Sequence, residues 1–93
     1  MSTATEEKLP RIFAALGDST RYQIMELLMR YPDICVSNLA FELDLSVSAV
    51  SQQCKLLELN GLVRRVRKGQ QICYQVRRDD PLVRSILSLV KET

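Results

Sequence analysis

Apolar residues recur at intervals of three and four along much of this 93-residue chain. Such spacing is typical of amphipathic helices that bury one face. Three such faces occur in the first half of the chain: Leu9, Ile12, Phe13 and Leu16, then Ile24, Leu27, Leu28 and Tyr31, then Val36, Leu39, Ala40 and Leu43. Residues 1–7 are polar and are predicted to form a disordered tail, which leaves residues 8–93 as a single domain.

Residues with turn or capping preferences separate these predicted helices. Pro10 suits the first turn of the first helix, and Gly17 suits its end. Asp18 is a good N-cap for the second helix, which Pro32 breaks. Cys35 stands where Ser or Thr would normally cap the third helix.

A fourth helix is predicted to open at Ser46, another good N-cap residue, and to stop at Asn60–Gly61. One of its faces is apolar and is expected to point inward: Val50, Cys54 and Leu57. A second face follows the same period but carries short polar groups with little charge. This polar stripe consists of Ser48, Ser51, Gln52 and Lys55.

The apolar period then changes from helical to two, which is typical of β-strands. Strands are predicted over residues 62–67 and 71–77, with residues 68–70 as the turn. Asp79, Asp80 and Pro81 are suited to open a last helix. That helix has more apolar residues than one small core can cover: Leu82, Val83, Ile86, Leu87, Leu89 and Val90.

The order of these elements predicts a mainly α fold with a small β-hairpin. The third and fourth helices are separated by only a few residues, which is the spacing of a helix-turn-helix. A basic hairpin directly after that unit makes it a winged helix-turn-helix. The second helix of such a unit enters the major groove of double-stranded DNA.

The distribution of charge agrees with a nucleic-acid partner. The net charge is only +2, but residues 51–78 carry seven basic residues and one acidic residue. A local positive field of this kind favours a polyanion. The hairpin is therefore predicted to bind the DNA backbone, together with the end of the polar stripe, through Lys55, Arg64, Arg65, Arg67, Lys68 and Gln70. The rest of the stripe suits base edges, because Ser and Gln can both donate and accept hydrogen bonds.

Three segments resemble the ArsR/SmtB family of small bacterial and archaeal repressors. "LGDSTRYQIMELL" is similar to the family's second helix, although Ser19 stands where proline is usual. "LAFELDLSVSAVSQQCKLLELNGLV" resembles its helix-turn-helix and "RRVRKGQQICYQV" its wing, so the resemblance covers about residues 9–90. It implies a homodimer, paired through its first and last helices, that represses transcription from an imperfect palindrome. Matching positions imply a base-contacting set of Val47, Ser48, Ser51 and Gln52.

The apolar surface of the first and last helices also favours a dimer, since neither helix is needed to complete the helix-turn-helix and a large exposed apolar patch is normally covered. The predicted interface is Leu9, Ile12, Phe13, Leu82, Val83, Ile86, Leu89 and Val90. A two-fold axis would place two recognition helices about 34 Å apart along DNA.

The metal sites of the resembling family are incomplete in this sequence. The chain has no histidine, so the last-helix site cannot be completed after Asp79 or Asp80. The third-helix site, a Cys-Val-Cys run followed by Asp-Leu, is here Cys35-Val36-Ser37-Asn38-Leu39. One thiolate per subunit is a poor site for a soft metal, so no metal or other cofactor is predicted. A regulator that responds to a metal or to a thiol-reactive effector through Cys35 is the alternative.

The three cysteines invite different interpretations. Cys35 lies at a predicted helix N-terminus, where a thiol pKa is lowered, and is either a thiol sensor for a reactive effector or a simple substitute for a capping serine. Cys54 is predicted to be a small buried hydrophobe. Cys73 faces away from Ile72 and Tyr74, which allows an exposed position on the hairpin. The sequence leaves open whether any two of them approach within disulfide range.

Other classes of protein fit poorly. Without histidine, a glycine-rich phosphate loop or paired carboxylates, an enzyme is not expected. No apolar run approaches 18 residues and no signal peptide is evident, so a cytoplasmic protein without membrane contact is predicted. The alternative is a winged-helix module that binds proteins without specific DNA binding, and the charge of the hairpin argues against it.

Overall fold

A computed structural model describes residues 3–91 of the chain, and the side chains of residues 7–90. Within that range the predicted order of elements, and with it the winged helix-turn-helix class, is confirmed. The elements are α1 (Thr3–Leu16), α2 (Ser19–Arg30), α3 (Val36–Leu43), α4 (Val47–Leu59), β1 (Val63–Lys68), β2 (Gln71–Val76) and α5 (Pro81–Lys91). None of the helices in residues 3–91 is long and apolar enough to span a membrane.

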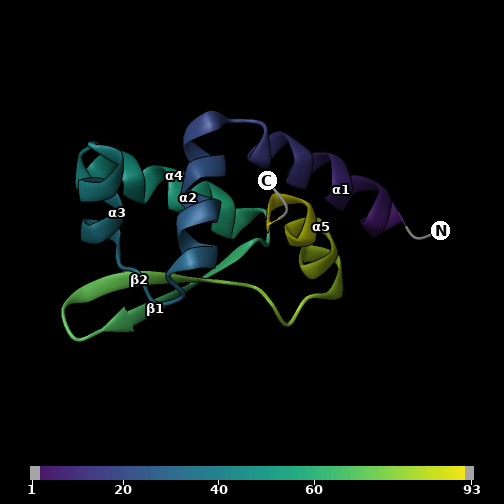
Figure 1. The fold of residues 1–93 in the computed structure, drawn as a ribbon. Coiled ribbons are helices and arrows are strands. Elements are labelled where there is room, and N and C mark those ends of the chain that lie inside the picture. The colour runs from purple at the N-terminus through teal and green to yellow at the C-terminus, as the bar shows by residue number, and fades with distance from the viewer. Residues whose placement is uncertain (1–2, 92–93) are drawn as a thin grey trace.

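The elements form an elongated body of 41 × 27 × 20 Å (Figure 1). At one end lie α3 and the turn of the hairpin, and at the other lie α1 and α5. The central helix is α2, and α4 runs behind it in this view. The helix-turn-helix and the tip of the hairpin therefore share one end of the molecule, while the two terminal helices occupy the other.

Capping groups fix where the central helices begin, as the sequence predicted. The carboxylate of Asp18 accepts a hydrogen bond from the Arg21 backbone N–H at 3.0 Å, and Ser46 Oγ accepts one from Ala49 at the same distance. Asp44, in the turn between α3 and α4, has a φ of 55°. Asp tolerates this left-handed conformation better than most residues, and it lets the chain reverse direction within a short turn.

The core draws on every helix and on both strands. Its buried side chains with no more than 2% of their area exposed are Ile12, Ile24, Met25, Leu28, Leu39, Val50, Cys54, Leu57, Leu62, Val63, Cys73, Tyr74 and Val83. The inward face of α4 is therefore confirmed. Tyr31, in contrast, is 50% exposed, so the prediction that it lies on the buried face of α2 is wrong. It is the C-cap residue, with φ −124° and ψ 86°, so it leaves the helical path and the face that the period predicts.

The start of the chain differs from the prediction. Helix α1 begins at Thr3 and so includes most of the segment that was assigned to a disordered tail, while Met1 and Ser2 lie outside the described residues. Pro10 is consequently inside the helix rather than in its first turn. The apolar period predicts only the part of the helix that packs on the core. The backbone hydrogen bonds of a helix do not require apolar side chains, so the helix can begin before the first apolar position.

The predicted dimer interface is also partly wrong. Ile12 and Val83 are fully buried in the chain's own core, and Ile86 and Val90 are only 6% and 8% exposed. The amphipathic pattern marks both kinds of apolar surface alike, so it could not separate core from interface. Phe13 and Leu89 do remain at the surface, with 55% and 66% of their areas exposed, and Leu9 and Leu82 are half-buried.

An ion pair between Lys8 and Asp80 joins α1 to the start of α5. The Nζ–Oδ2 distance is 2.8 Å, and this hydrogen bond holds the pKa of the Asp80 carboxyl below its usual value of 3.8. A carboxyl with a lowered folded-state pKa stabilises the fold above its unfolded pKa, and that stabilisation is lost as the pH falls through the folded pKa.

We therefore expect Lys8→Met to lower the melting temperature at pH 7 by about 1–4 °C, a small effect because both partners are partly exposed to screening solvent. The Asp80 carboxylate keeps its other hydrogen bond, to Leu82 N, in this variant. Thermal unfolding followed by circular dichroism at several pH values checks the prediction. The difference from wild type should shrink below pH 3.8, and an equal difference at neutral and strongly acid pH would contradict it.

Candidate nucleic-acid interface

The outer face of α4 is a continuous polar surface. Ser48, Gln52 and Lys55 are exposed and Ser51 is half-buried between them, whereas the opposite face of the helix is buried. Val47, in the first turn, is 52% exposed. The residues predicted to contact bases thus lie together at the N-terminal half of one helix. Their short side chains allow close approach to a groove, and the helix N-terminus favours a nearby phosphate.

The register of the hairpin decides which of its basic residues lie on the same side as α4. Arg65 pairs with Tyr74 across the sheet, and directly paired residues project from the same face. Tyr74 is only 2% exposed and belongs to the core cluster that includes Cys54 of α4. This burial raises the pKa of the Tyr74 hydroxyl. The face of the hairpin that carries Arg65, and by alternation Arg67, is therefore the face toward α4.

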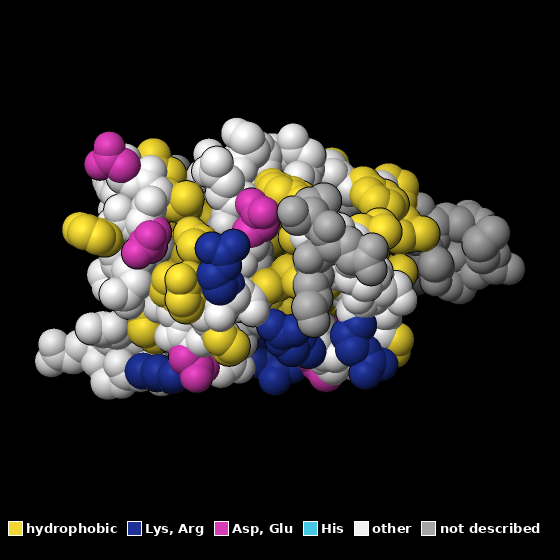
Figure 2. Space-filling model, in the orientation of Figure 1, with side chains coloured by type: hydrophobic (Ala, Val, Ile, Leu, Met, Phe, Trp, Pro, Cys, Tyr) yellow, Lys and Arg dark blue, Asp and Glu magenta, His cyan; other side chains and the backbone are white. Residues whose placement is uncertain are grey.

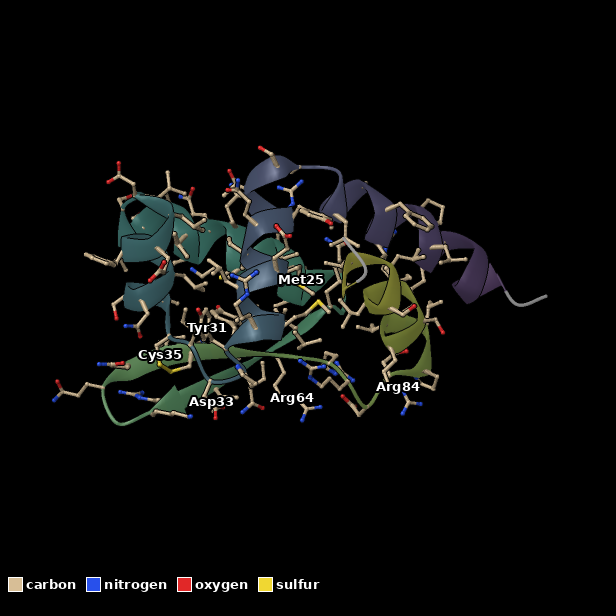
Figure 3. The ribbon with its side chains drawn as sticks, viewed as in Figure 1. Met25, Tyr31, Asp33, Cys35, Arg64 and Arg84 are labelled. Carbon is tan, nitrogen blue, oxygen red and sulfur yellow. A yellow bond between two sulfur atoms is a disulfide. The ribbon has the colours of Figure 1, made fainter. Side chains whose placement is uncertain are left out.

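The opposite face of the hairpin carries Arg64 and Lys68, and each is paired with a carboxylate. Arg64 Nη2 lies 3.2 Å from an oxygen of Asp79, and Lys68 Nζ lies 3.2 Å from an oxygen of Asp33. Figure 3 shows Arg64 and Asp33 along the same edge of the molecule, in front of the strands. The predicted backbone-binding set is thus divided between two faces, which the sequence did not reveal.

The two groups also differ in their acidic neighbours. In the described part of the chain, Lys55, Arg65 and Arg67 have no carboxylate within ion-pair distance. Arg67 Nε instead donates to the carbonyl of Gly69 at 3.1 Å, in the hairpin turn next to the exposed Gln70. On the α2 side of the molecule, Lys and Arg gather along the edge of the hairpin and the start of α5, with Asp and Glu among them (Figure 2). Within the predicted phosphate-binding set, the basic side chains without a carboxylate partner are those of α4 and of the hairpin face toward α4.

Arg21 is a positioning residue that the prediction did not assign. Its Nε donates to the carbonyl of Ala15 at 2.8 Å, and its Nη1 donates to Gln53 Oε1 of α4 at 2.9 Å. One guanidinium therefore connects the end of α1, the start of α2 and the recognition helix. Arg21 belongs to the second-helix motif, but nothing in the spacing of the sequence identifies Gln53 as its partner.

Known proteins with similar sequences and structures are DNA-binding regulators with the same fold. Residues 18–65 match the family model described as "Bacterial regulatory protein, arsR family". The chain belongs to the arsR family. An uncharacterized HTH-type transcriptional regulator of Methanocaldococcus jannaschii is 33% identical over 86 residues, which are 92% of this arsR-family chain and 94% of that protein.

Two further relatives extend the comparison. A transcriptional repressor SmtB homolog of Synechocystis is 34% identical over 76 residues, 82% of this chain but only 57% of that protein, so the chain spans little more than half of that relative's length. A solution structure of a homodimeric winged helix-turn-helix DNA-binding domain from Mycobacterium bovis superposes with a TM-score of 0.83 at 26% identity, covering 98% of this chain and 84% of that one. The ArsR/SmtB resemblance is confirmed, and this family of regulators is not a class of enzymes.

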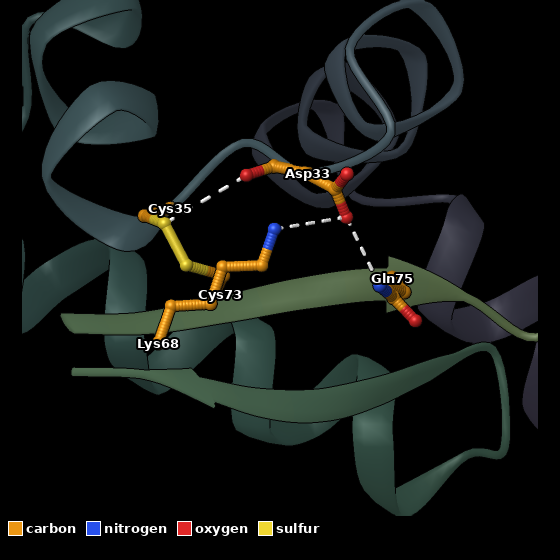
Figure 4. Close-up of a disulfide and its surroundings, with 5 residues drawn as sticks. All are labelled: Asp33, Cys35, Lys68, Cys73 and Gln75. Atoms are coloured by element: carbon orange, nitrogen blue, oxygen red, sulfur yellow. Dashed lines mark hydrogen bonds and ion pairs between the residues drawn. A yellow bond between two sulfur atoms is a disulfide. The ribbon is translucent and has the colours of Figure 1, made fainter.

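The cysteines of this arsR-family chain are arranged differently from the prediction. Cys35 and Cys73 are joined by a disulfide (Figure 4). Cys73 is fully buried rather than exposed, because the segment before α3 pairs with the free edge of β2 at this position and Cys35 is bonded to the Cys73 sulfur. Cys35 is the N-cap residue of α3 but makes no side-chain capping bond, so its interpretation as a substitute for a capping serine is wrong.

Cys54 matches its prediction as a small buried hydrophobe. It is a free thiol with no exposed area, and burial raises its pKa to about 12. A thiol in this environment stays protonated and unreactive at neutral pH. No group of three or more His, Cys, Asp or Glu side chains within residues 7–90 is placed to hold a metal ion.

Proposed function

We propose that this arsR-family protein is a homodimeric repressor of transcription that binds a palindromic operator in double-stranded DNA. The observation that carries the proposal is the position of a basic hairpin next to a helix with a polar outer face. The face of the hairpin that carries Arg65 and Arg67 is turned toward α4. An α-helix fits the major groove, and a hairpin beside it reaches the adjoining phosphates or minor groove.

In this proposal the first turns of α4 contact bases, and Lys55 and the hairpin contact phosphate. Val47, Ser48, Ser51 and Gln52 would contact base edges, because their hydroxyl, amide and methyl groups can distinguish base pairs in the major groove. Lys55, Arg65, Arg67 and Gln70 would contact phosphate. Arg64 and Lys68 would contribute less, since each has a carboxylate partner and lies on the other face of the hairpin.

A second copy of the chain would pair through α1 and α5. Phe13 and Leu89 border a shallow apolar hollow between α1, α2 and α5, at the opposite end of the body from the hairpin tip. Pairing at this end would leave both α4 surfaces free and about one helical turn of DNA apart. The homodimeric state of the M. bovis domain supports this arrangement.

The proposal predicts different effects of neighbouring arginines. Arg65→Ala and Arg67→Ala should each weaken binding to every duplex and lower the salt dependence by about one phosphate contact. Arg64→Ala is the matched control on the same strand and should have a much smaller effect, because its charge is already paired. Fluorescence anisotropy at several salt concentrations, with a duplex from the protein's own upstream region and an unrelated duplex, measures both quantities.

Gln52→Ala tests the base-contacting surface in the same assay. It should reduce discrimination at one base pair by about 1–3 kcal/mol while leaving the salt dependence unchanged. If Arg64→Ala and Arg67→Ala had equal effects, the assignment of faces would be wrong. If the protein bound no duplex at low salt, the proposed function would fail, and a search for protein partners would then test the alternative interaction module.

A further inference from the structure

The C-terminal half of α4 has α1 as a neighbour. Gln53, Leu56 and Asn60 form one edge of α4, because they follow one another at helical spacing. Arg11 of α1 lines a shallow recess of about 190 Å³ together with Leu56 and Asn60. This edge adjoins the polar stripe, since Leu56 follows Gln52 by one helical turn and is still 40% exposed. The recess therefore lies next to the surface that is proposed to contact bases.

Two guanidinium groups line this recess, those of Arg11 and Arg21. Arg21 is fixed by its hydrogen bonds to Ala15 and Gln53, whereas Arg11 is exposed to solvent. Within residues 7–90, no carboxylate lies within ion-pair distance of Arg11, not even that of Glu7, one turn earlier in α1. None of the other side chains that line the recess is charged. The recess therefore has a positive local field and free donors, which favour a phosphate group.

Arg11 also remains accessible in the proposed dimer. It projects from the side of α1 opposite Phe13, because residues two positions apart in a helix point roughly 200° apart. Ile12, between them in the sequence, is fully buried in the core. Pairing through Phe13 would therefore leave the recess beside α4 uncovered.

The place of the recess in the dimer determines which part of the operator it would reach. Helix α1 lies at the end of the body that is proposed to pair, whereas the turn of the hairpin lies at the other end (Figure 1). The two recesses of a dimer would thus face the centre of the operator, and the two wings its outer parts. Phosphates face the protein at that centre, because two major grooves one turn apart enclose one minor groove and the strands that border it.

We propose that the recess lined by Arg11 and Arg21 is a further phosphate-binding site for DNA, and that it binds the backbone at the centre of the operator. Arg11 is the contacting residue, because its guanidinium can donate two parallel hydrogen bonds to one phosphate. Arg21 is the positioning residue that fixes the edge of α4 beside it. The inference rests on the proposed function and adds a contact that neither the recognition helix nor the wing supplies.

Arg11→Gln tests the contact, because glutamine removes the charge and has a similar preference for a helix. The measurement is fluorescence anisotropy at several salt concentrations, with a duplex from the protein's own upstream region. We expect the Kd to rise about 10-fold and the salt dependence to fall by about one phosphate contact in each subunit. Arg11→Lys should keep the salt dependence of the wild type, because an ammonium group also binds phosphate.

Arg84→Gln is the matched control, since it removes the same charge from another exposed helical position. Within residues 7–90, Arg84 has no carboxylate within ion-pair distance, and it lies along the same edge of the molecule as Arg64 (Figure 3). It should change the Kd by less than about 2-fold, because the charge is distant from the duplex and screened by salt. Equal losses for Arg11→Gln and Arg84→Gln would show an effect of net charge alone and would refute the proposed contact.

Duplexes with neutral methylphosphonate linkages locate the contact on the DNA, once footprinting has placed the two half-sites. Linkages at the operator centre should weaken binding by the wild type but not by Arg11→Gln. Linkages at the outer ends should weaken binding by both, because the wings contact phosphate there. A central substitution that weakened both proteins equally would overturn the inference.

The remaining outcomes separate this inference from the proposed function. Sedimentation velocity should show that Arg11→Gln is still dimeric, and a monomeric variant would mean that Arg11 acts in pairing instead. If Arg11→Gln bound DNA like the wild type while Arg67→Ala was impaired, the recess would not be a DNA site and the proposed function would stand. If the wild type bound no duplex at low salt, the proposed function would fail, and this inference with it.

Discussion

Replacing both Phe13 and Leu89 by glutamate is expected to make the protein monomeric and to weaken operator binding by about 100-fold or more. Both side chains are exposed, at 55% and 66%, beside the apolar hollow at the end of the body formed by α1 and α5. Charges placed there would have to be buried without partners in the proposed dimer, which is strongly unfavourable. The loss in affinity is large because a dimer binds its second half-site as an intramolecular event.

Sedimentation velocity and DNA anisotropy measure the two parts of this prediction. Phe41→Glu is a suitable control for the oligomeric state, because Phe41 is 84% exposed on α3 at the opposite end of the body. It should leave the protein dimeric. A double variant that still sedimented as a dimer would exclude this surface as the interface. A monomer that kept full operator affinity would show that pairing is not needed for DNA binding.

The largest expected effect on folding is that of Leu57→Ala, in the buried face of α4. Leu57 is fully buried in the core cluster together with Val50 and Cys54. Truncation removes buried methyl groups and leaves a cavity, which lowers the free energy of unfolding by about 2–5 kcal/mol. That is a large fraction of the 5–15 kcal/mol that is typical of a whole domain, so the variant should be partly unfolded or close to it at 37 °C.

Leu59→Ala is the matched control, because it makes the same chemical change in the last turn of the same helix. Leu59 is 81% exposed, so its truncation should change the free energy of unfolding by no more than about 0.5 kcal/mol. Urea denaturation at fixed protein concentration compares the two variants with wild type. Similar losses for both would mean that α4 does not bury the face described here.

The sequence alone determined the helices, the hairpin and the helix-turn-helix, because these depend on local signals. The caps at Asp18 and Ser46 and the stop at Asn60–Gly61 each act within one helical turn, and the structure has them as predicted. Membership of the arsR family was equally accessible, since the matching segments lie in order along the chain. The polar face of α4 followed from the helical period once Val50, Cys54 and Leu57 were placed inside.

Only the tertiary structure decided which basic residues of the hairpin lie on the side of α4. A period of two shows that Arg64 and Arg65 point in opposite directions, but packing alone decides which of them is on the side of α4. The same holds for contacts between distant segments: Lys8 with Asp80 across 72 positions, Gln75 with Asp33 across 42, and Cys35 with Cys73 across 38. Local preferences carry no information at such separations, because the residues meet only after helices and hairpin have packed on a common core.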